Sequence, residues 1–302
     1  MPVTGAGGLT VGITGATGYL GRRVAEAFQR RGWQIRSLGR RMLPGFEGIP
    51  FALGEPVPAA ALLGLQALVH CAYDFSVTHP DTIRRVNVEG SRHLLVAARE
   101  AGVPRLVWVS SISAFPGCRS VYGLAKLAIE EDGLAAGALM VRPGLIWGES
   151  PGGTFGNLVA QVGKSRLIPL IGDGSQVQFL VHHHDLAEFI VGHCTERLPG
   201  TTVPVTVAHP RGWAFADLLR AIGRGMGREP YLIPFPWRAT WAALKLAEAL
   251  RIRLRFRSDS VVSLMHQNPT PDFHTIERLG MVCRPFPESF RVREPGRASD
   301  RS

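Results

Sequence analysis

Two kinds of segment alternate along the first half of this chain. Short apolar runs rich in Val, Ile and Leu are separated by longer segments in which apolar residues recur every three or four positions. The short runs predict buried strands, and the longer segments predict amphipathic helices. Regular succession of the two is typical of an α/β fold with a parallel sheet. Strands are expected near residues 11–14, 34–38, 51–55, 67–72, 105–109 and 138–141.

Helical periodicity is clear after several of these strands. After the first strand, Leu20, Val24 and Phe28 share one helical face, and Gly32 suits the residue that ends the helix. Further helices are expected over residues 79–101 and from Tyr122 to about Asp132.

Beyond residue 152 the pattern is less regular, which favours a second, smaller lobe. The apolar stripe from Phe155 to Val162 predicts a helix, residues 172–176 a turn, and residues 178–181 a strand. Residues 237–250 form an amphipathic pattern, and residues 275–280 predict a short terminal helix.

Three consecutive histidines, residues 182–184, follow the strand expected at 178–181. Because neighbouring side chains on a strand point to opposite faces, we expect these histidines not to converge on one metal ion. Asp185 is expected to cap the helix that comes next. We therefore predict no metal site.

The composition disfavours membrane-spanning, disulfide-rich and nucleic-acid-binding proteins. The chain has 302 residues, of which 45% are hydrophobic, and a net charge of +10. We find no apolar run long enough for a membrane span and no signal peptide, so a cytoplasmic protein is expected. The four cysteines, Cys71, Cys118, Cys194 and Cys283, are too scattered for a zinc site or a disulfide framework. No Lys/Arg block with interleaved aromatic residues indicates nucleic-acid binding.

Arginines alternate with apolar residues after the amphipathic segment, at Arg251, Arg253, Arg255 and Arg257. If this segment is extended, they share one face. They could bind a substrate phosphate, an acidic partner or membrane headgroups, or they could simply be exposed. The sequence leaves their role open.

A glycine-rich stretch, residues 11–21, joins the first strand to the first helix. Gly15, Gly18 and Gly21 recur every three residues. Glycine allows a tight turn and lets backbone N–H groups approach a ligand. The helix N-terminus beyond it favours a pyrophosphate. The context predicts dinucleotide binding, with the pyrophosphate held by Gly15, Thr17, Gly18, Tyr19 and Leu20.

The second strand is followed by Arg40 and Arg41. In dinucleotide-binding folds an acid at this position holds the 2′-hydroxyl of NAD, whereas a base accommodates the 2′-phosphate of NADP. No acid is present, and guanidinium groups suit a phosphate. NADP(H) is therefore the preferred cofactor, with NAD(H) as the alternative.

Ser111 follows the strand at 105–109, and Tyr122 and Lys126 follow on the next helix. Residues four apart share one helix face. A lysine ammonium beside a phenol favours the phenolate, so we expect a lowered pKa for Tyr122 and a role as acid/base. A serine at the strand end can hydrogen-bond the substrate oxygen.

Over roughly residues 10–285 the chain resembles the extended short-chain dehydrogenase/reductase family, the NAD-dependent epimerase/dehydratase group. The resemblance is carried by T-G-A-T-G-Y-L-G in 14–21, Y-x-x-x-K in 122–126 and R-P-G-L-I-W-G in 142–148. It implies a Rossmann-type doubly wound parallel sheet with a smaller C-terminal substrate-binding lobe.

The resemblance also implies roles for particular residues. Ser111 takes the catalytic serine position, with Ser113 as the alternate, and Lys126 also holds the nicotinamide ribose. Pro143 and Leu145 flank the nicotinamide. Other residues implied near the cofactor are Glu55 at the adenine, His70 as a packed histidine, Cys71, Ala72, Tyr73 in place of a small alanine, and Asn87 as an active-site support.

The expected domains follow from the resemblance. Residues 1–150, with about 176–194, form the NADP(H)-binding domain. Residues 151–175 and 195–290 form the substrate-binding lobe, and residues 291–302 a disordered tail.

We expect an oxidoreductase that transfers hydride to or from a ketone or alcohol carbon. A sugar-nucleotide epimerase with tightly bound NAD is the alternative within the enzymes, and a non-catalytic NADPH-binding sensor or accessory subunit is the alternative outside them. Ser111–Ser113 offers no carboxylate, which disfavours a sugar 4,6-dehydratase. The expected partner is a small-molecule substrate, for which the net charge allows an anionic group, and the protein is a homodimer or a monomer.

Overall fold

Seven parallel strands form the central sheet of the computed structural model, which describes residues 8–292 except 42, 196–200, 251 and 253–255. Their order is β11-β6-β5-β4-β1-β2-β3. Strand β1 lies inside the sheet, with β2 and β3 on one side of it and β4, β5, β6 and β11 on the other. This is the strand order of a doubly wound Rossmann fold, so the predicted fold class is confirmed. The strands are β1 Thr10–Thr14, β2 Gln34–Gly39, β3 Glu47–Pro50, β4 Ala67–His70, β5 Arg105–Val109, β6 Leu139–Pro143 and β11 Val205–Val207.

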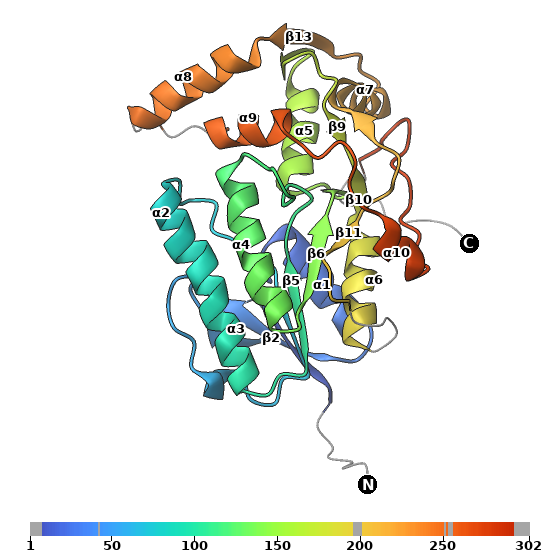
Figure 1. Ribbon diagram of the computed structural model, residues 1–302. Helices are drawn as coiled ribbons and strands as arrows, with labels where there is room; N and C mark the ends of the chain where they lie inside the picture. Colours follow the sequence, from blue (N-terminus) through green and yellow to red (C-terminus); the bar gives the residue numbers. More distant parts are fainter. Residues whose placement is uncertain (1–7, 42, 196–200, 251, 253–255, 293–302) are drawn as a thin grey trace, which may run out of the picture.

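Helices cover both faces of this sheet (Figure 1). A hydrophobic cluster lies on each face of the sheet. In β4, Ala67 and Val69 pack into one cluster, and Leu68 packs into the other. Both faces are therefore buried, which explains why the strand reads as a continuous apolar run. The flanking helices are α1 Tyr19–Gln29 and α6 His183–Cys194 on one face, and α2 Pro80–Ile83, η2 Arg84–Glu89, α3 Gly90–Glu100 and α4 Val121–Ala135 on the other.

The helix expected over 79–101 is present, but one stretch of it has π-helical geometry. This stretch, η2, contains the buried Asn87. A π segment within a helix is frequently found at a functional site.

The prediction of a strand over residues 51–55 is wrong. Strand β3 lies earlier, at Glu47–Pro50, and the chain turns at Gly54, which has φ +89°. Gly54 packs on Gly90, where an added Cβ would lie 2.3 Å from the Gly54 nitrogen. This close contact between backbones holds the segment in a turn rather than a strand.

The C-terminal lobe lies above the carboxyl ends of the strands in Figure 1. Strand β11 comes from the range expected for this lobe, yet it pairs with β6 as an edge of the main sheet. None of the helices in the described residues has the length and apolar character needed to cross a bilayer.

The remaining elements are β7 Leu145–Trp147, α5 Gly153–Lys164, β8 Leu167–Ile171, β9 Val177–Gln178, β10 Leu180–His182, β12 Trp213–Ala214, α7 Phe215–Gly225, β13 Tyr231–Phe235, α8 Trp237–Ala249, α9 Ser258–Met265 and α10 His274–Arg278, with a short 3-10 turn, η1, at Ala59–Leu62.

The tail expected at 291–302 lies almost entirely outside the described residues, as do three of the four alternating arginines. Arg257 is described. The amphipathic and terminal helices expected at 237–250 and 275–280 are confirmed as α8 and α10.

The contact between Gly54 and Gly90 predicts a stability effect. Gly90→Ala forces two backbone segments apart, so we expect the free energy of unfolding to fall by about 1–3 kcal/mol. Gly163→Ala is the matched control. Gly163 lies in helix α5, and an added Cβ there would meet only the Met226 sulfur, at 3.8 Å. Urea unfolding followed by circular dichroism measures both, and equal stability of the two variants contradicts the packing argument.

Candidate active site

The glycine loop between β1 and α1 depends on the absence of side chains. Gly15 has φ +66°, and an added Cβ would lie 3.0 Å from the Ala72 nitrogen. A Cβ on Gly21 would lie 2.2 Å from the Gly15 oxygen. The Gly18 N–H donates to the same oxygen at 2.9 Å. The loop is therefore tightly folded against the end of β4.

Helix α1 begins at this loop without a side-chain cap. Gly18 is the N-cap residue and has no side-chain acceptor, and the first turn contains no acidic residue. The N–H groups of the first turn and the partial positive charge of the helix end suit a pyrophosphate. Thr17, Tyr19 and Leu20 lie at this end, so the predicted residues fit a dinucleotide.

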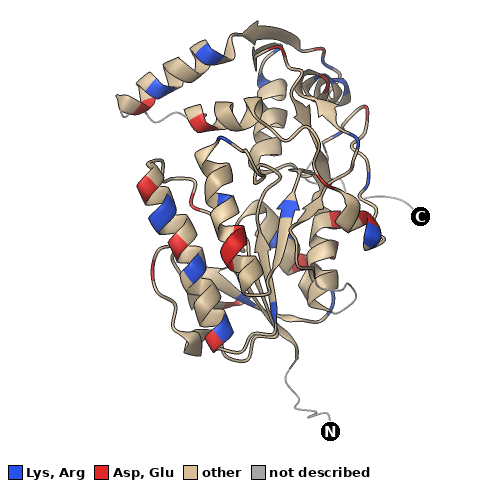
Figure 2. Ribbon diagram, viewed as in Figure 1, with Lys and Arg blue, Asp and Glu red and all other residues tan. Residues whose placement is uncertain are grey.

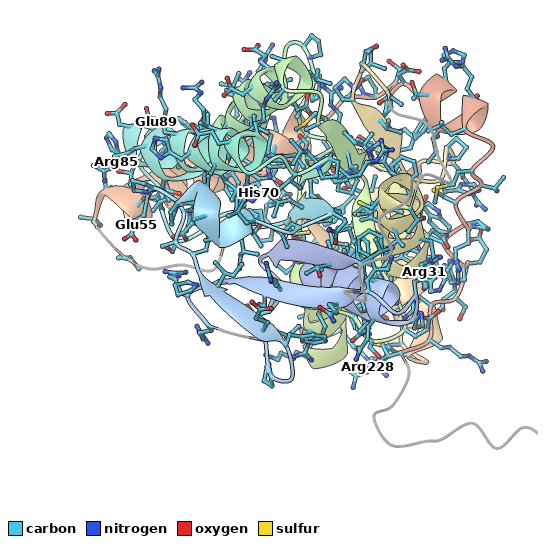
Figure 3. The ribbon with its side chains drawn as sticks, turned by 90° about the horizontal axis from the view of Figure 1, so that it is seen from below. Arg31, Glu55, His70, Arg85, Glu89 and Arg228 are labelled. Carbon is cyan, nitrogen blue, oxygen red and sulfur yellow. The ribbon has the colours of Figure 1, made fainter. Side chains whose placement is uncertain are left out.

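A buried hydrogen-bond chain fixes the end of β4 beside the glycine loop. The Thr14 hydroxyl lies 2.7 Å from His70 Nδ1, and His70 Nε2 lies 2.9 Å from the Ser91 hydroxyl. Burial lowers the pKa of His70 to about 3, and the Lys126 charge adds to this. His70 lies deep inside the molecule, whereas Glu55 lies at its periphery, on the side where Arg85 lies (Figure 3). His70 is thus a packed histidine, as expected.

Ser111, Tyr122 and Lys126 come together beyond the carboxyl end of β5. Ser111 follows this strand, and its side chain hydrogen-bonds the Tyr122 phenol. Tyr122 and Lys126 lie one turn apart on α4, where Lys126 is buried and Tyr122 is half-buried. The structure thus assembles the three residues that the sequence singled out.

Ser111 also differs from Ser113 in its surroundings. The Ser113 N–H donates to the Ser111 hydroxyl at 3.1 Å, whereas the Ser113 hydroxyl lies 3.4 Å from that of Ser263 on α9. Because Ser111 is the serine bonded to Tyr122, the geometry favours it over the alternate.

The electrostatics of Tyr122 differ from the expectation. Burial raises the pKa of Tyr122 above its usual value, and the Ser111 hydrogen bond offsets this only in part. Lys126 donates instead to the Val109 carbonyl at 2.8 Å, and its Nζ lies 4.8 Å from the centre of the Tyr73 ring. The expected lowering of the tyrosine pKa is therefore wrong for this arrangement, because the lysine ammonium is directed to other groups.

Lys126 itself is strongly affected by burial. Its pKa falls to about 8, although the nearby Cys71 and Glu130 side chains raise it in part. Cys71 is half-buried beside it, and burial raises the pKa of its thiol to about 12. Cys71 is thus a neutral, unreactive neighbour of the site.

Aromatic rings surround the phenol of Tyr122. The Tyr73 ring meets it edge-on with centroids 5.1 Å apart, and the Phe75 ring lies 5.7 Å away. Tyr73 thus contacts both Lys126 and Tyr122. The sequence marked Tyr73 as unusual but did not predict this position between the two.

Asn87 holds the loop that carries these rings. Its Oδ1 accepts from the Asp74 N–H at 2.7 Å, and its Nδ2 donates to the Asp74 carbonyl at 3.2 Å. The Arg257 guanidinium donates to the carbonyls of Phe75 and Val77 in the same loop. Asn87 therefore supports the site through backbone contacts, as the resemblance implied.

Asp259, on α9, is the residue that sequence reasoning missed. Its carboxylate accepts from the Val121 N–H at 2.7 Å and from the Tyr122 N–H at 3.1 Å. It caps α4 together with Ser120, whose hydroxyl accepts from the Gly123 N–H. No spacing or motif could have paired a residue of the C-terminal lobe with this helix.

The other predicted cofactor residues surround this centre. Arg40 and Arg41 are exposed after β2. The Pro143 carbonyl accepts from the Ile112 N–H at 3.0 Å, which ties β6 to the segment after β5. Leu145 lines a small cavity beside the serine segment, together with Ile112, Ser113 and Phe179.

The histidine segment requires two corrections. Helix α6 begins at His183, so strand alternation ends there, and donor atoms of Glu149, His182 and His183 lie within 4.8 Å of one another. His182 is the N-cap residue, since its Nδ1 accepts from the His184 N–H, whereas Asp185 pairs with Arg284 at 2.7 Å.

This capping bond limits metal binding by His182. With Nδ1 as an acceptor, the neutral ring carries its proton on Nε2, which donates to Glu149 at 3.1 Å. A metal ion could bind Nε2 only by displacing this proton. His183, whose Nδ1 lies 2.8 Å from the Tyr19 hydroxyl, instead ties α6 to the glycine loop.

Comparison with known proteins defines the class. Residues 11–202 match the model of the NAD dependent epimerase/dehydratase family. The chain is 32% identical to the ceramide reductase of Caulobacter vibrioides over 241 residues, 75% of this chain and 73% of the relative. It is 23% identical to the UDP-glucose 4-epimerase of Vibrio cholerae over 257 residues, 74% of this chain and 78% of the relative.

The chain belongs to the NAD-dependent epimerase/dehydratase family, within the extended short-chain dehydrogenases/reductases. Its members are oxidoreductases, epimerases and dehydratases. The structure of MoeE5 in complex with UDP-glucuronic acid and NAD has the same fold, with a TM-score of 0.72 at 20% identity over 92% of this chain and 94% of that one.

The lowered pKa of Lys126 predicts a pH dependence of stability. Between about pH 8, the pKa of Lys126 in the folded protein, and pH 10.5, its ordinary pKa, the unfolded chain binds more protons, so the free energy of unfolding rises with pH in this window. Relative to Lys126→Met, the wild-type free energy of unfolding should rise by up to about 1.4 kcal/mol per pH unit there. Urea unfolding at several pH values measures this difference. A constant difference across the window contradicts the burial of a charged lysine.

Proposed function

We propose that this protein is an NADPH-dependent oxidoreductase that interconverts a ketone and an alcohol. The observation that carries the proposal is the hydrogen bond between Ser111 and Tyr122 at the end of β5, with Lys126 one turn further along α4. It lies beside a glycine loop whose shape suits a pyrophosphate. A phenol, a hydroxyl and an ammonium in this arrangement support proton transfer to a substrate oxygen.

Residues of three segments would hold the cofactor. The loop and the start of α1 would hold the pyrophosphate, Lys126 the nicotinamide ribose, and Pro143 and Leu145 the nicotinamide. When bound, NADPH supplies a hydride to the carbonyl carbon. Cys71, Ala72 and Tyr73 lie at the end of β4, where they would contact the cofactor.

Tyr122 supplies the proton of the reduction. The carbonyl carbon gains the hydride while the phenol O–H bond breaks and its proton goes to the carbonyl oxygen, which leaves an alcohol, NADP⁺ and a phenolate that takes a proton from solvent. Ser111 orients the oxygen and stabilises its developing charge. The raised pKa of Tyr122 keeps its phenol protonated near neutral pH, which suits donation of the proton.

We infer an apolar substrate for this site. Phe75 packs against Tyr122 yet is 63% exposed. The cavity beside Ser113 has apolar walls from Ile112, Leu145, Val177 and Phe179, and Gln178, Gln267 and Asn268 complete its lining. Similarity to a ceramide reductase supports a ketone that carries long hydrocarbon chains.

Removal of the phenol tests the proposed acid. Tyr122→Phe should lower kcat by at least about 100-fold, because the general acid is lost, while the Kd for NADPH changes little. Turnover of a keto-ceramide is followed by NADPH absorbance, and binding by NADPH fluorescence. Tyr231→Phe is the control, since Tyr231 is exposed on β13. Wild-type turnover in Tyr122→Phe contradicts the proposal.

The arginines after β2 test the cofactor preference. If Arg40 and Arg41 hold the 2′-phosphate, Arg40→Ala with Arg41→Ala should raise the KM for NADPH at least about tenfold, because charge-assisted hydrogen bonds are lost. The KM for NADH should stay nearly unchanged. Equal effects on both cofactors argue against NADP selectivity.

The epimerase alternative predicts a different purified protein. It would carry bound NAD in a one-to-one ratio and would act on a nucleotide sugar without added cofactor. Release of nucleotides by denaturation, followed by chromatography, distinguishes this outcome from cofactor-free protein that needs added NADPH.

A further inference from the structure

Helix α8 is an unusual surface element, because none of its thirteen residues is buried. It lies along the outer edge of the C-terminal lobe, where it follows β13 (Figure 1). Its inner face contacts α9: Glu248 accepts from the N–H and the hydroxyl of Ser258 at 2.9 and 2.8 Å, and Trp237 lies edge-on to His266.

The outward face of α8 is apolar rather than polar. Leu246 and Leu250, one turn apart, are 62% and 64% exposed. A surface helix of a soluble protein normally presents polar residues to solvent, and contiguous apolar patches on a surface mark interaction sites. We name this surface the α8 face; its exposed residues are Ala239, Ala242, Ala243, Leu246, Ala249 and Leu250.

Basic residues border the α8 face. Arg238 and Lys245 are exposed and seven residues apart, so they lie on the same side of the helix. Figure 2 shows Lys and Arg positions in blue along α8. The sequence from 237 to 257 contains six Lys or Arg residues and one acidic residue, Glu248, whose carboxylate is directed to Ser258. An apolar face with a basic border is the pattern of a helix that lies in a membrane interface.

We propose that the α8 face docks on an anionic lipid bilayer. Leu246 and Leu250 enter the boundary of the acyl chains, while Arg238 and Lys245 reach the headgroups with their long stems. The positive charge around the α8 face also disfavours a second copy of this chain as its partner. In a symmetric dimer the same basic edges would meet each other, and the chain as a whole carries +10.

Docking would place the bilayer next to the site. Helix α8 is hydrogen-bonded to Ser258, the following residue Asp259 accepts from the Tyr122 N–H, and Arg257 holds the loop of Phe75. A lipid ketone could thus reach Tyr122 while its chains remain near the α8 face. This consequence rests on the proposed function, whereas the docking itself does not.

Flotation of the purified full chain with vesicles tests the docking. Wild type should float with phosphatidylcholine vesicles that contain phosphatidylglycerol, and less with phosphatidylcholine alone. Leu246→Glu with Leu250→Glu should weaken binding at least about tenfold. The matched control is Leu63→Glu with Val282→Glu, which makes the same change at exposed residues of other surfaces and should leave binding unchanged.

The charges are tested separately. Arg238→Ala with Lys245→Ala should weaken binding to the anionic vesicles about 20-fold, whereas Arg85→Ala with Arg278→Ala, exposed arginines elsewhere, should not. Failure of wild type to float, or equal flotation of the Leu246 and Leu250 variant, overturns the proposal. A concentration-dependent dimer that this variant abolishes, with no vesicle binding by wild type, also overturns it.

Turnover separates this proposal from the proposed function. The Leu246 and Leu250 variant should reduce a short-chain keto-ceramide in detergent micelles at the wild-type rate, and lose activity only towards a long-chain one in vesicles. A wild type that floats but reduces neither ketone refutes the proposed function alone.

Discussion

The carboxylate of Asp259 accepts from the backbone N–H groups of Val121 and Tyr122 at the start of α4, and Tyr122 is the proposed acid of the reaction. A helix N-terminus has unpaired N–H groups and partial positive charge, so this carboxylate stabilises the end of α4 and ties the C-terminal lobe to it. The two residues before Asp259 make further contacts: Arg257 holds the loop of Phe75, and Ser258 bonds to Glu248 of α8, so one segment connects both to α4. The Rossmann sheet supplies the site, and the lobe sets its geometry.

The local parts of the site were predictable because they obey short-range rules. The spacing of Tyr122 and Lys126 places both on one face of α4, and the glycines of the first loop are required by backbone contacts within a few ångströms. The strands β4 and β5 are apolar on both faces, and β1 carries Val11 and Ile13 on one face before the glycine loop, so their sequences identify them. Ser111 could be assigned because it lies two residues beyond the end of β5.

The parts that failed depend on contacts between distant residues. The segment 51–55 reads as a strand, but packing of Gly54 on Gly90 makes it a turn. Asp185 reads as a helix cap, but it pairs with Arg284, and His182 caps the helix instead. The pKa of Tyr122 depends on its burial and on the Ser111 hydrogen bond, while Lys126 donates to the Val109 carbonyl, and the spacing of residues reveals none of these.

The central claim is that Tyr122 and Ser111 assist a hydride transfer to a ketone carbon, and the fate of that hydride tests it most directly. NADPH deuterated at C4 is mixed with wild-type protein and a keto-ceramide, and the product is analysed by mass spectrometry and NMR. The account predicts one deuterium on the new alcohol carbon, and none on that carbon when unlabelled NADPH is used in deuterated water. An alcohol without deuterium from the labelled cofactor, or no alcohol at all, would contradict it.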